Sequence, residues 1–554
     1  MTMQNYQQYY DNFSPADIEA LMLGSLNDGF NICEECVDKW AADPSLVALR
    51  HEGADGSSTQ LTFKQLQEKS SQFANYLASR GIGKGDRVAA LLPRTPELMV
   101  VIMGTLRAGA MYQPLFTAFG SGAIEYRVQQ ASTQLLITDP NNRSKLDEVN
   151  GCPPVLLVNK ANADAKYASD LDFAEQVNAM ATVFTPVRVG KDEPFLQMFT
   201  SGTVGKSKGV AVPTRAVLSF YVYMKFAIGL EPDDNFWNVA DPGWAYGLYY
   251  AVVGPLLLGN TTHFCEAGFT PETTYAMITK YNITNFAAAP TAYRMLMAND
   301  HILGADDKFN VRVASSAGEP LNPEVVGWIE RRLGCPVMDH YGQTETGMTA
   351  CNHHNLAQSV VRIGSMGFSM PGYKVVALDN DYNEIPANEG GQLAVDVENS
   401  PLFFFQGYTW NEKNPFYGKY YLTGDVVTSH GDGSFTFTGR DDDIITTAGY
   451  RVGPADVEST LLEHESVAES AVIGKPDPKR GSIIKAYVVV KQGYTPNEEL
   501  KETLQELVRR RLSTHAFPRE IDFMDELPKT PSGKIQRFIL RQQARDEADS
   551  VTTN

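Results

Sequence analysis

Apolar residues along the chain recur at two spacings that alternate with each other. Residues 61–83 begin with a Thr62-x-x-Gln65 capping pattern and continue with apolar residues at helical spacing, which predicts a helix. The next segments read as strand, helix, a short apolar run and strand, at 87–93, 96–110, 111–115 and 132–139. This alternation indicates α/β architecture with parallel sheets. We therefore expect a large three-layer α/β body over residues 1–440.

The last hundred residues show a different pattern. Two strand-like runs and an amphipathic helical stretch precede a final strand, a Pro/Gly loop and a helix, at 466–477, 483–493, 497–513 and 519–544. These elements predict a compact α+β domain over residues 441–554. The junction, 437–451, is rich in Gly, Arg and Asp, and hinges are often built from small or polar loop residues. We place the hinge near Asp442 and expect the small domain to move.

Composition narrows the class of protein. Of 554 residues, 43% are hydrophobic and 20% are charged, as in an ordinary globular chain. The net charge of −19 gives no basic footprint for nucleic acid, although a local basic site for an anionic ligand stays open. Six cysteines are too few for a disulfide framework, and the lone Cys33-x-x-Cys36 lacks the further ligands that zinc needs. We expect a reducing, cytoplasmic location.

We expect neither a secretory signal at the N-terminus nor a membrane-spanning helix. The first residues are polar and acidic, unlike a secretory signal. The longest uncharged stretch runs from Trp244 to Cys265 and is interrupted by glycines and Pro255. A spanning helix needs about 20 predominantly apolar residues, so a buried core segment is the better interpretation.

The segment 200–209, TSGTVGKSKG, is the strongest candidate for chemistry. Three glycines let backbone N–H groups approach phosphate oxygens, and two lysines supply positive charge. A Walker A loop needs glycine five residues before Gly205, and Thr200 stands there instead. Composition alone leaves a flexible solvated loop open as the alternative.

Further motifs follow in a fixed order. They are AGEPLNP at 317–323, HYGQTETG at 340–347, YLTGDVV at 421–427, GRDDDIITTAGYRVGPADVE at 439–458 and PKTPSGKIQR at 528–537. Together with the segment at 200–209, they resemble the core motifs of the adenylate-forming (ANL) superfamily, over about residues 60–545. Within it, the chain is most similar to acetyl-CoA synthetase-like and medium-chain acyl-CoA synthetases. The resemblance implies the two-domain fold already expected from the pattern.

The resemblance also implies a reaction. A carboxylic acid and ATP give acyl-AMP and pyrophosphate, and CoA then gives acyl-CoA and AMP, with Mg²⁺ assisting. Two related activities stay open: an acyl-adenylate ligase that loads a carrier protein, and a short-chain acetate or propionate CoA ligase. Luciferase-like oxidation fits less well. A non-catalytic nucleotide sensor also fits less well, because a degenerate member should lose Lys534, Asp425 or the phosphate segment, and all are present. The oligomeric state is left open.

By resemblance, site residues are assigned as follows. Lys534 would contact the carboxylate and the α-phosphate, Thr344 the α-phosphate, and Glu345 the Mg²⁺ ion. Asp425 would accept hydrogen bonds from the ribose, with Arg440 beside it. The full ATP and AMP set is Thr200, Ser201, Gly202, Thr203, Lys206, Gly318, Glu319, Pro320, Asp339, Tyr341, Gly342, Gln343, Thr344, Asp425, Arg440 and Arg451. The CoA set is Gly449, Tyr450 and Arg509.

The choice of acid is predicted from the acyl pocket, which would comprise Trp244, Ala245, Tyr246, Gly247 and Gly342. Acetyl-CoA synthetases resemble this chain but carry tryptophan at the position of Gly342. Loss of an indole is expected to open a large volume, unless the ring of Tyr246 refills it. We therefore expect a medium-chain, branched or simple aromatic acid, with acetate a poor substrate.

Overall fold

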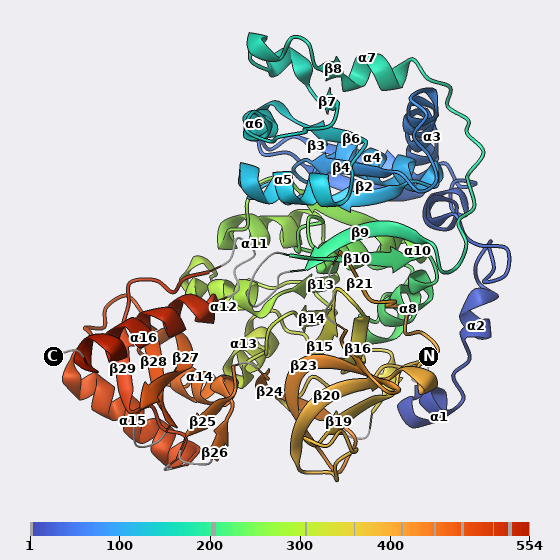
Figure 1. Ribbon diagram of the computed structural model, residues 1–554. Coiled ribbons are helices and arrows are strands. Elements are labelled where there is room, and N and C mark those ends of the chain that lie inside the picture. The colour runs from blue at the N-terminus through green and yellow to red at the C-terminus, as the bar shows by residue number, and fades with distance from the viewer. Residues whose placement is uncertain are drawn as a thin grey trace.

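The computed structural model describes residues 4–200, 207–304, 307–358, 361–410, 414–441, 443–447, 450–477, 481–513, 515–529 and 535–552, with the backbone alone at 450, 451, 481 and 548–552. Figure 1 shows a large body followed by a small C-terminal part. Within the described ranges, no helix is long and apolar enough to cross a membrane.

Local sequence signals fix the first elements as expected. Helix α3 (Phe63–Ser79) begins at the predicted capping box, in which Thr62 and Gln65 each accept a backbone N–H of the other. The next predicted segments are also confirmed, as β4 (Arg87–Leu91), α4 (Pro96–Arg107), β5 (Met111–Pro114) and β6 (Leu135–Thr138). Strands β4, β5 and β6 pair in parallel, so this part has the predicted α/β character.

An eight-stranded sheet crosses the large body in the order β21-β10-β9-β5-β4-β6-β7-β8. Its antiparallel edge is the hairpin of β9 (Pro194–Thr200) and β10 (Lys208–Pro213), which β21 (Tyr408–Thr409) extends. The remaining elements of this layer are α5 (Ser121–Gln130), α6 (Pro140–Arg143), β7 (Val155–Leu157), β8 (Leu171–Asp172) and α7 (Phe173–Asn178).

A second sheet has six strands in the order β11-β13-β14-β15-β16-β18. Strands β14 (Val313–Ala317) and β15 (Val337–Gln343) are parallel, and β15 then pairs antiparallel with β16 (Gly347–Cys351). The carboxyl ends of β14 and β15 therefore lie at one edge. The other strands and the helices between them are β11 (Phe236–Asn238), α11 (Pro271–Lys280), β13 (Asn285–Ala288), α12 (Pro290–Ala298), α13 (Pro323–Arg332) and β18 (Phe368–Ser369).

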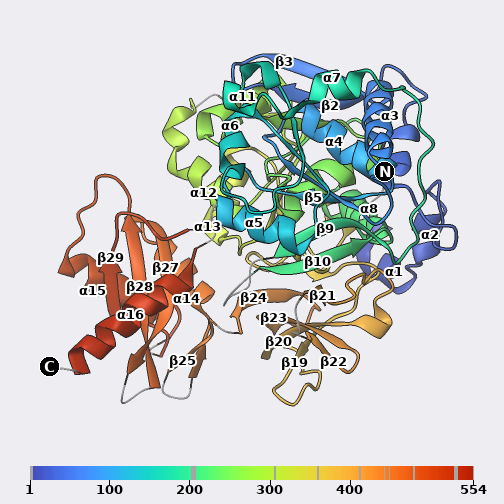
Figure 2. The same ribbon diagram turned by 45° about the horizontal axis from the view of Figure 1, so that its top comes forward.

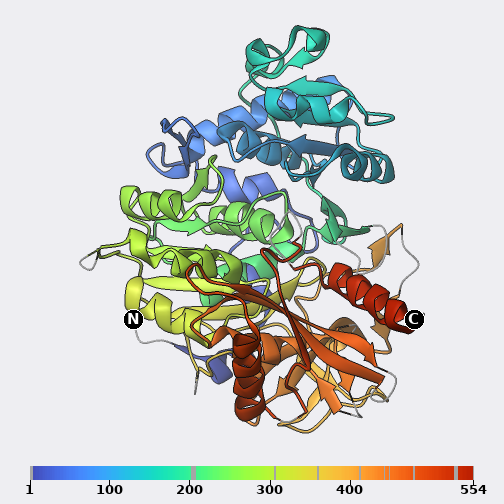
Figure 3. The same ribbon diagram turned by 90° about the vertical axis from the view of Figure 1, so that its left-hand side faces the viewer.

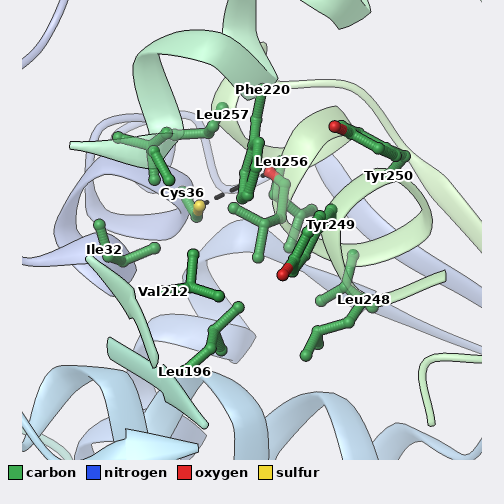
Figure 4. Packing of buried hydrophobic residues seen from close by; sticks show 14 of the residues in the cluster. Ile32, Cys36, Leu196, Val212, Phe220, Leu248, Tyr249, Tyr250, Leu256 and Leu257 are labelled. Carbon is green, nitrogen blue, oxygen red and sulfur yellow. Dashed lines mark hydrogen bonds between the residues drawn. The ribbon is translucent and has the colours of Figure 1, made fainter. Parts of the chain in front are cut away.

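A helical layer lies between these two sheets. It comprises α8 (Ala216–Val222), η5 (Tyr223–Ala227), α9 (Ala245–Gly247), η6 (Leu248–Val253) and α10 (Gly254–Leu257). Its side chains share one apolar core with Leu196 and Val212 of the first sheet, and Figure 4 shows Phe220, Tyr249 and Leu256 in it. The uncharged stretch is thus a buried core segment, as predicted.

The first forty residues, for which no motif gave a role, pack onto the large body. Helix α1 (Tyr6–Asp11) is tied to it by the Tyr6 hydroxyl, which donates to the Ser369 carbonyl at 2.7 Å. The Cys33 thiol lies 3.7 Å from the Ser70 hydroxyl and the Cys36 thiol 3.7 Å from the Val253 carbonyl, and both cysteines are free. Nearby elements are β1 (Gln4–Asn5), α2 (Pro15–Glu19), η1 (Glu34–Asp38), β2 (Val47–Glu52), β3 (Ser58–Thr62), β12 (Thr262–Cys265) and β17 (Leu356–Ala357).

A third sheet completes the large body and carries part of the candidate site. Its strands are β19 (Val375–Leu378), β20 (Gly390–Asp396), β22 (Phe416–Tyr417), β23 (Tyr420–Ser429) and β24 (Phe435–Arg440). Strands β23 and β24 pair antiparallel, with Asp425 opposite Arg440.

The C-terminal part has its own apolar cores and is α+β, as predicted. Figures 2 and 3 show its strands and helices gathered beside the large body. The two predicted strands pair antiparallel as β27 (Val467–Asp477) and β28 (Gly481–Val490). The other elements are β25 (Ile445–Thr447), β26 (Tyr450–Val452), α14 (Pro454–Leu462), α15 (Glu498–Arg511), β29 (Glu520–Phe523) and α16 (Arg537–Thr552). The hinge position Asp442 lies outside the described residues.

Candidate functional site

The ribose-side candidates meet where β15 faces β23. Asp425 is buried, and its Oδ2 accepts hydrogen bonds from the Tyr341 hydroxyl and, at 2.9 Å, from Gln343 Nε2. The Asp425 backbone N–H donates to the Thr423 hydroxyl at 3.2 Å. Arg440 lies opposite in the β23–β24 register. A buried, oriented carboxylate beside a guanidinium suits a ligand that presents hydroxyl donors.

Tyr341 and Gln343 are themselves held in place. Gln343 Nε2 also donates to the Thr423 carbonyl at 2.9 Å, and its Oε1 accepts from the Tyr421 hydroxyl at 2.8 Å. Burial and the charge of Asp425 raise the pKa of Tyr341 well above its usual value. Tyr341 therefore stays protonated and donates to Asp425. This hydrogen bond fixes the position of the Tyr341 ring beside Asp425.

Glu345 lies on the turn between β15 and β16 and is only 6% exposed. Its Oε1 accepts a hydrogen bond of 2.8 Å from the Tyr408 hydroxyl, and the Lys208 ammonium lies 4.1 Å from the centre of the Tyr408 ring. The hairpin β9–β10 and Glu345 are thus joined through Tyr408. A buried carboxylate near the predicted phosphate segment fits Mg²⁺, which takes one or two carboxylates together with phosphate oxygens.

Two tyrosines of the helical layer support the turn that carries Thr344. The Tyr249 hydroxyl donates to the Thr344 carbonyl at 3.0 Å, and the Tyr250 hydroxyl accepts from the Met348 N–H at 3.1 Å. Gly347, between them in the chain, has φ +65°, a backbone conformation that side chains disfavour. The turn is therefore set by buried contacts on its inner side.

The predicted phosphate segment spans the β9–β10 hairpin. Thr200, the last residue of β9, pairs with Lys208, the first of β10. Ser201, Gly202, Thr203 and Lys206 lie outside the described residues. Ser207 is held by two side chains of α5, since its carbonyl accepts from the Tyr126 hydroxyl at 2.9 Å and its hydroxyl accepts from Arg127 at 3.0 Å.

The adenine-side candidates follow β14. Gly318 has φ +99° and is exposed, whereas Pro320 is half-buried. Glu319 accepts from the Thr291 hydroxyl at 2.8 Å and pairs with Arg294 at 2.5 Å, so its carboxylate is already held. Asp339 is buried, which raises the pKa of its carboxyl well above the usual value, and no described group bonds its Oδ1. Asp339 therefore offers a polar atom to a ligand at this edge.

Four of the acyl-side candidates, 244–247, form α9 and its N-cap, and the fifth, Gly342, lies on β15. Trp244 is half-buried and packs against Phe116 and Phe119, with ring centres 5.6 and 5.5 Å apart. Ala245 and Tyr246 follow it, and they are half-buried as well. Gly247 is buried against Asp241, whose carbonyl oxygen would lie 2.1 Å from a Cβ at position 247. Gly247 is thus required by packing.

The backbone of β16 occupies the direction that a side chain at Gly342 would take. A Cβ at this position would lie 2.3 Å from the Gly347 carbonyl oxygen and 2.7 Å from the Met348 Cα. The β15–β16 register shifts between Tyr341 and Gly342, which brings the β16 backbone against residue 342. The neighbouring strand therefore fills the space that an absent side chain was expected to leave.

Few of the predicted site residues of the small domain can be placed at the candidate site. Lys534 and Gly449 lie outside the described residues, and the backbone of Tyr450 and Arg451 forms β26. Arg509 is exposed on α15 and pairs with Glu506 at 2.7 Å. No described contact joins Arg509 to the site at β15.

A hydrogen bond joins the small domain to the adenine-side loop. The Asn322 amide donates to the Ser459 hydroxyl of α14 at 2.9 Å. Burial lowers the pKa of Arg537, the first residue of α16, but the charges of Glu458, Asp443 and, least of these, Glu319 raise it. Lys534, three positions earlier, lies outside the described residues.

Sequence reasoning missed the residues that hold the candidate site together, namely Tyr249, Tyr408, Tyr421 and Thr423. Each acts through a neighbour that is 63 to 95 positions away in the chain or through a backbone group. Strand pairing and helix packing, rather than spacing, bring them in. The YLTGDVV motif contains Tyr421 and Thr423, whereas only the tyrosine-rich character of their segments could have drawn attention to Tyr249 and Tyr408.

Comparison with known proteins agrees with this geometry. A profile described as "AMP-binding enzyme" matches residues 34–408, and "AMP-binding enzyme C-terminal domain" matches residues 456–534. The acetyl-coenzyme A synthetase of Bacillus subtilis is 35% identical over 97% of this chain and 95% of its own.

Solved structures agree as well. The acyl-CoA synthetase of Brucella canis is 49% identical, with a TM-score of 0.79 over 98% of this chain and 99% of its own. A benzoate CoA ligase of Burkholderia xenovorans is 26% identical, with a TM-score of 0.81 over 92% and 100%. The chain therefore belongs to the AMP-binding enzymes, in which it is an AMP-forming acyl-CoA synthetase.

Proposed function

We propose that this acyl-CoA synthetase activates a medium-chain, branched or simple aromatic acid at the edge formed by β14, β15 and β23. The observation that carries the placement is the cluster of Asp425, Tyr341 and Gln343, which lies beside Arg440 and close to the turn of Glu345. The groups proposed to accept from the ribose hydroxyls and those proposed to lie near the phosphates thus come together from separate strands and turns. Such convergence suits a nucleotide whose ribose and phosphates are gripped at different points.

In the first half-reaction, a carboxylate oxygen attacks the α-phosphorus of ATP, and pyrophosphate leaves. Asp425 accepts from the ribose hydroxyls, and Thr344 donates to the α-phosphate. Lys534 stabilises charge as it builds up between the carboxylate and the phosphate, where a positioned donor has its greatest effect. Glu345 would hold Mg²⁺, which would supply positive charge for the leaving pyrophosphate.

In the second half-reaction, the CoA thiol attacks the acyl carbonyl, and AMP leaves with the oxygen that came from the acid. We propose that the small domain turns about Asp442 between the two steps. Lys534 then withdraws, and the face of Gly449, Tyr450 and Arg451 approaches. Glycine at 449 would let the pantetheine arm pass, because it carries no side chain. Arg509 is proposed to contact the nucleotide end of CoA.

The choice of acid rests on the aromatic strip at the start of α9. Trp244 and Tyr246 are only half-buried, whereas residues 247–253 are fully buried. An apolar acid would cover the strip, at about 0.8 kcal/mol for each CH₂ group removed from water. Gly342 does not support this choice of acid, because the β16 backbone lies against it. The likeness to a benzoate CoA ligase, which shares the fold, favours an apolar acid for this chain.

A short-chain acid is the second candidate. It is favoured by the filled space at Gly342 and by the likeness to an acetyl-coenzyme A synthetase. Transfer to a carrier protein instead of CoA is a third, but no observation on the chain favours it.

A series of acids tests the proposal. The protein, MgATP and CoA are mixed in turn with acetate, butanoate, hexanoate, decanoate, benzoate and a branched acid. Each methylene that enters the site is expected to raise kcat/KM about three- to fourfold, up to a peak near hexanoate or benzoate. Acyl-CoA and AMP are measured by mass spectrometry. A preference for acetate over hexanoate contradicts the proposed acid class, and acyl-AMP without thioester indicates a carrier acceptor.

A further inference from the structure

Arg127 on α5 is a buried cation with unusual surroundings. Its side chain is 8% exposed, and its guanidinium lies 4.2 Å from the centre of the Phe119 ring and 5.6 Å from that of Phe199. One Nη donates to the Ala123 carbonyl at 2.9 Å and the other to the Ser207 hydroxyl at 3.0 Å. Among the described residues, no carboxylate pairs with it.

Two other arginines of the same body, the buried Arg107 and the half-buried Arg143, have carboxylate partners. Arg107 forms two hydrogen bonds with Asp38, and Arg143 pairs with Asp170 at 2.5 Å. Burial lowers the pKa of Arg127 to about 10, so it remains charged at neutral pH but is poorly compensated. A buried charge without an opposite partner is costly, and such groups cluster at functional sites.

The contacts of Arg127 connect it to both ends of the predicted phosphate segment. Phe199 directly precedes Thr200, and Ser207 directly precedes Lys208, which pairs with Thr200 across the hairpin. The neighbouring Tyr126 donates to the Ser207 carbonyl. Two consecutive residues of α5 therefore hold both the backbone and the side chain of Ser207.

We propose that Arg127 is a positioning residue for the pyrophosphate end of ATP. Through Ser207 and Phe199, it holds the two ends of the predicted phosphate segment, and its charge, which no described carboxylate pairs with, favours the polyphosphate. The inference rests on the proposed function. It predicts an effect on the half-reaction that involves pyrophosphate and none on the half-reaction that involves CoA, because pyrophosphate has left before CoA reacts.

The test separates the two half-reactions in the full chain. Acid-dependent exchange of labelled pyrophosphate into ATP reports the first, and AMP release from synthetic hexanoyl-AMP with CoA reports the second. Arg127→Met is expected to raise the KM for pyrophosphate at least tenfold, the range of one lost hydrogen bond to a charged group. Thioester formation should stay within about twofold. Arg127→Lys keeps the charge but not the planar guanidinium. Its KM for pyrophosphate should lie between those of the wild type and Arg127→Met.

Two further variants control for loss of packing. Ser207→Ala removes the acceptor but leaves the buried charge, so it tests the same link even where Arg127→Met fails to fold. The double variant of Arg127→Met and Ser207→Ala should have no higher KM for pyrophosphate than Arg127→Met alone, because both changes remove the same contact. Arg143→Met is the matched control, since its guanidinium also lies 4.2 Å from a ring centre, that of Tyr167, on the same body. It should leave the KM for pyrophosphate unchanged.

Several outcomes overturn the inference. Arg127 then has only a structural role if both half-reactions fall together in Arg127→Met and Ser207→Ala, or if neither variant changes the KM for pyrophosphate. Wild-type protein that exchanges no pyrophosphate with any acid contradicts the proposed function itself, whereas normal wild-type exchange with unaffected variants contradicts this inference alone.

Discussion

Lys534→Ala is expected to slow acyl-adenylate formation by about 10²- to 10³-fold, the usual effect of removing one donor from a developing negative charge. Thioester formation from supplied acyl-AMP should change by less than a factor of about three, because the proposed domain turn removes Lys534 before CoA reacts. The hydrogen bond from Asn322 to Ser459 of α14 supports an approach of the small domain to the adenine-side loop. Pyrophosphate exchange and AMP release measure the two steps separately.

Lys529→Ala is the matched control for that change. Lys529 precedes the same motif, is exposed, and pairs with Glu469 at 2.6 Å within the small domain. Its removal should affect neither step, since an exposed ion pair contributes little to stability. Equal losses in both half-reactions of Lys534→Ala, with Lys529→Ala unaffected, would show that the lysine does not act in adenylation alone.

Asp425→Ala is expected to raise the KM for ATP about 10- to 100-fold, as loss of hydrogen bonds to a charged group does. The Tyr341 hydroxyl and the Gln343 amide lose their acceptor at the same time, so the corner is left with unpaired donors. Unlike Lys534→Ala, this change should weaken both half-reactions, because ATP and acyl-AMP carry the same ribose.

A deoxynucleotide series isolates the contact with the ribose. Wild-type protein should discriminate against 2′-deoxy- and 3′-deoxy-ATP, and Asp425→Ala should lose most of that discrimination. Asp381→Ala, on an exposed turn of the third sheet, is the control and should retain it. Persistence of the discrimination in Asp425→Ala would place the ribose elsewhere.

Local signals predicted the elements of residues 61–139 and of the last hundred residues, because these signals need no distant partner. The capping box at Thr62 sets the start of α3, and alternating apolar runs give the parallel strands β4, β5 and β6. The paired strands β27 and β28 follow from two adjacent apolar runs. Composition also places the Trp244–Cys265 stretch in the core.

The site was less accessible to sequence reasoning. The space at Gly342 depends on a register shift between β15 and β16, which no side-chain pattern encodes. The hydrogen bond from Tyr408 to Glu345 joins positions 63 residues apart through the β10–β21 pairing. Motifs thus indicated which residues carry chemistry, whereas the surrounding sheet decides how each is held.

The fate of the acid's oxygen tests the central claim most directly. The protein is incubated with MgATP, CoA and hexanoate labelled with ¹⁸O in both carboxylate oxygens, and the products are weighed by mass spectrometry. Attack of the carboxylate on the α-phosphorus followed by thiol attack on the carbonyl predicts one ¹⁸O in each AMP and none in pyrophosphate. Unlabelled AMP, or label in inorganic phosphate with release of ADP, would contradict an acyl-adenylate route.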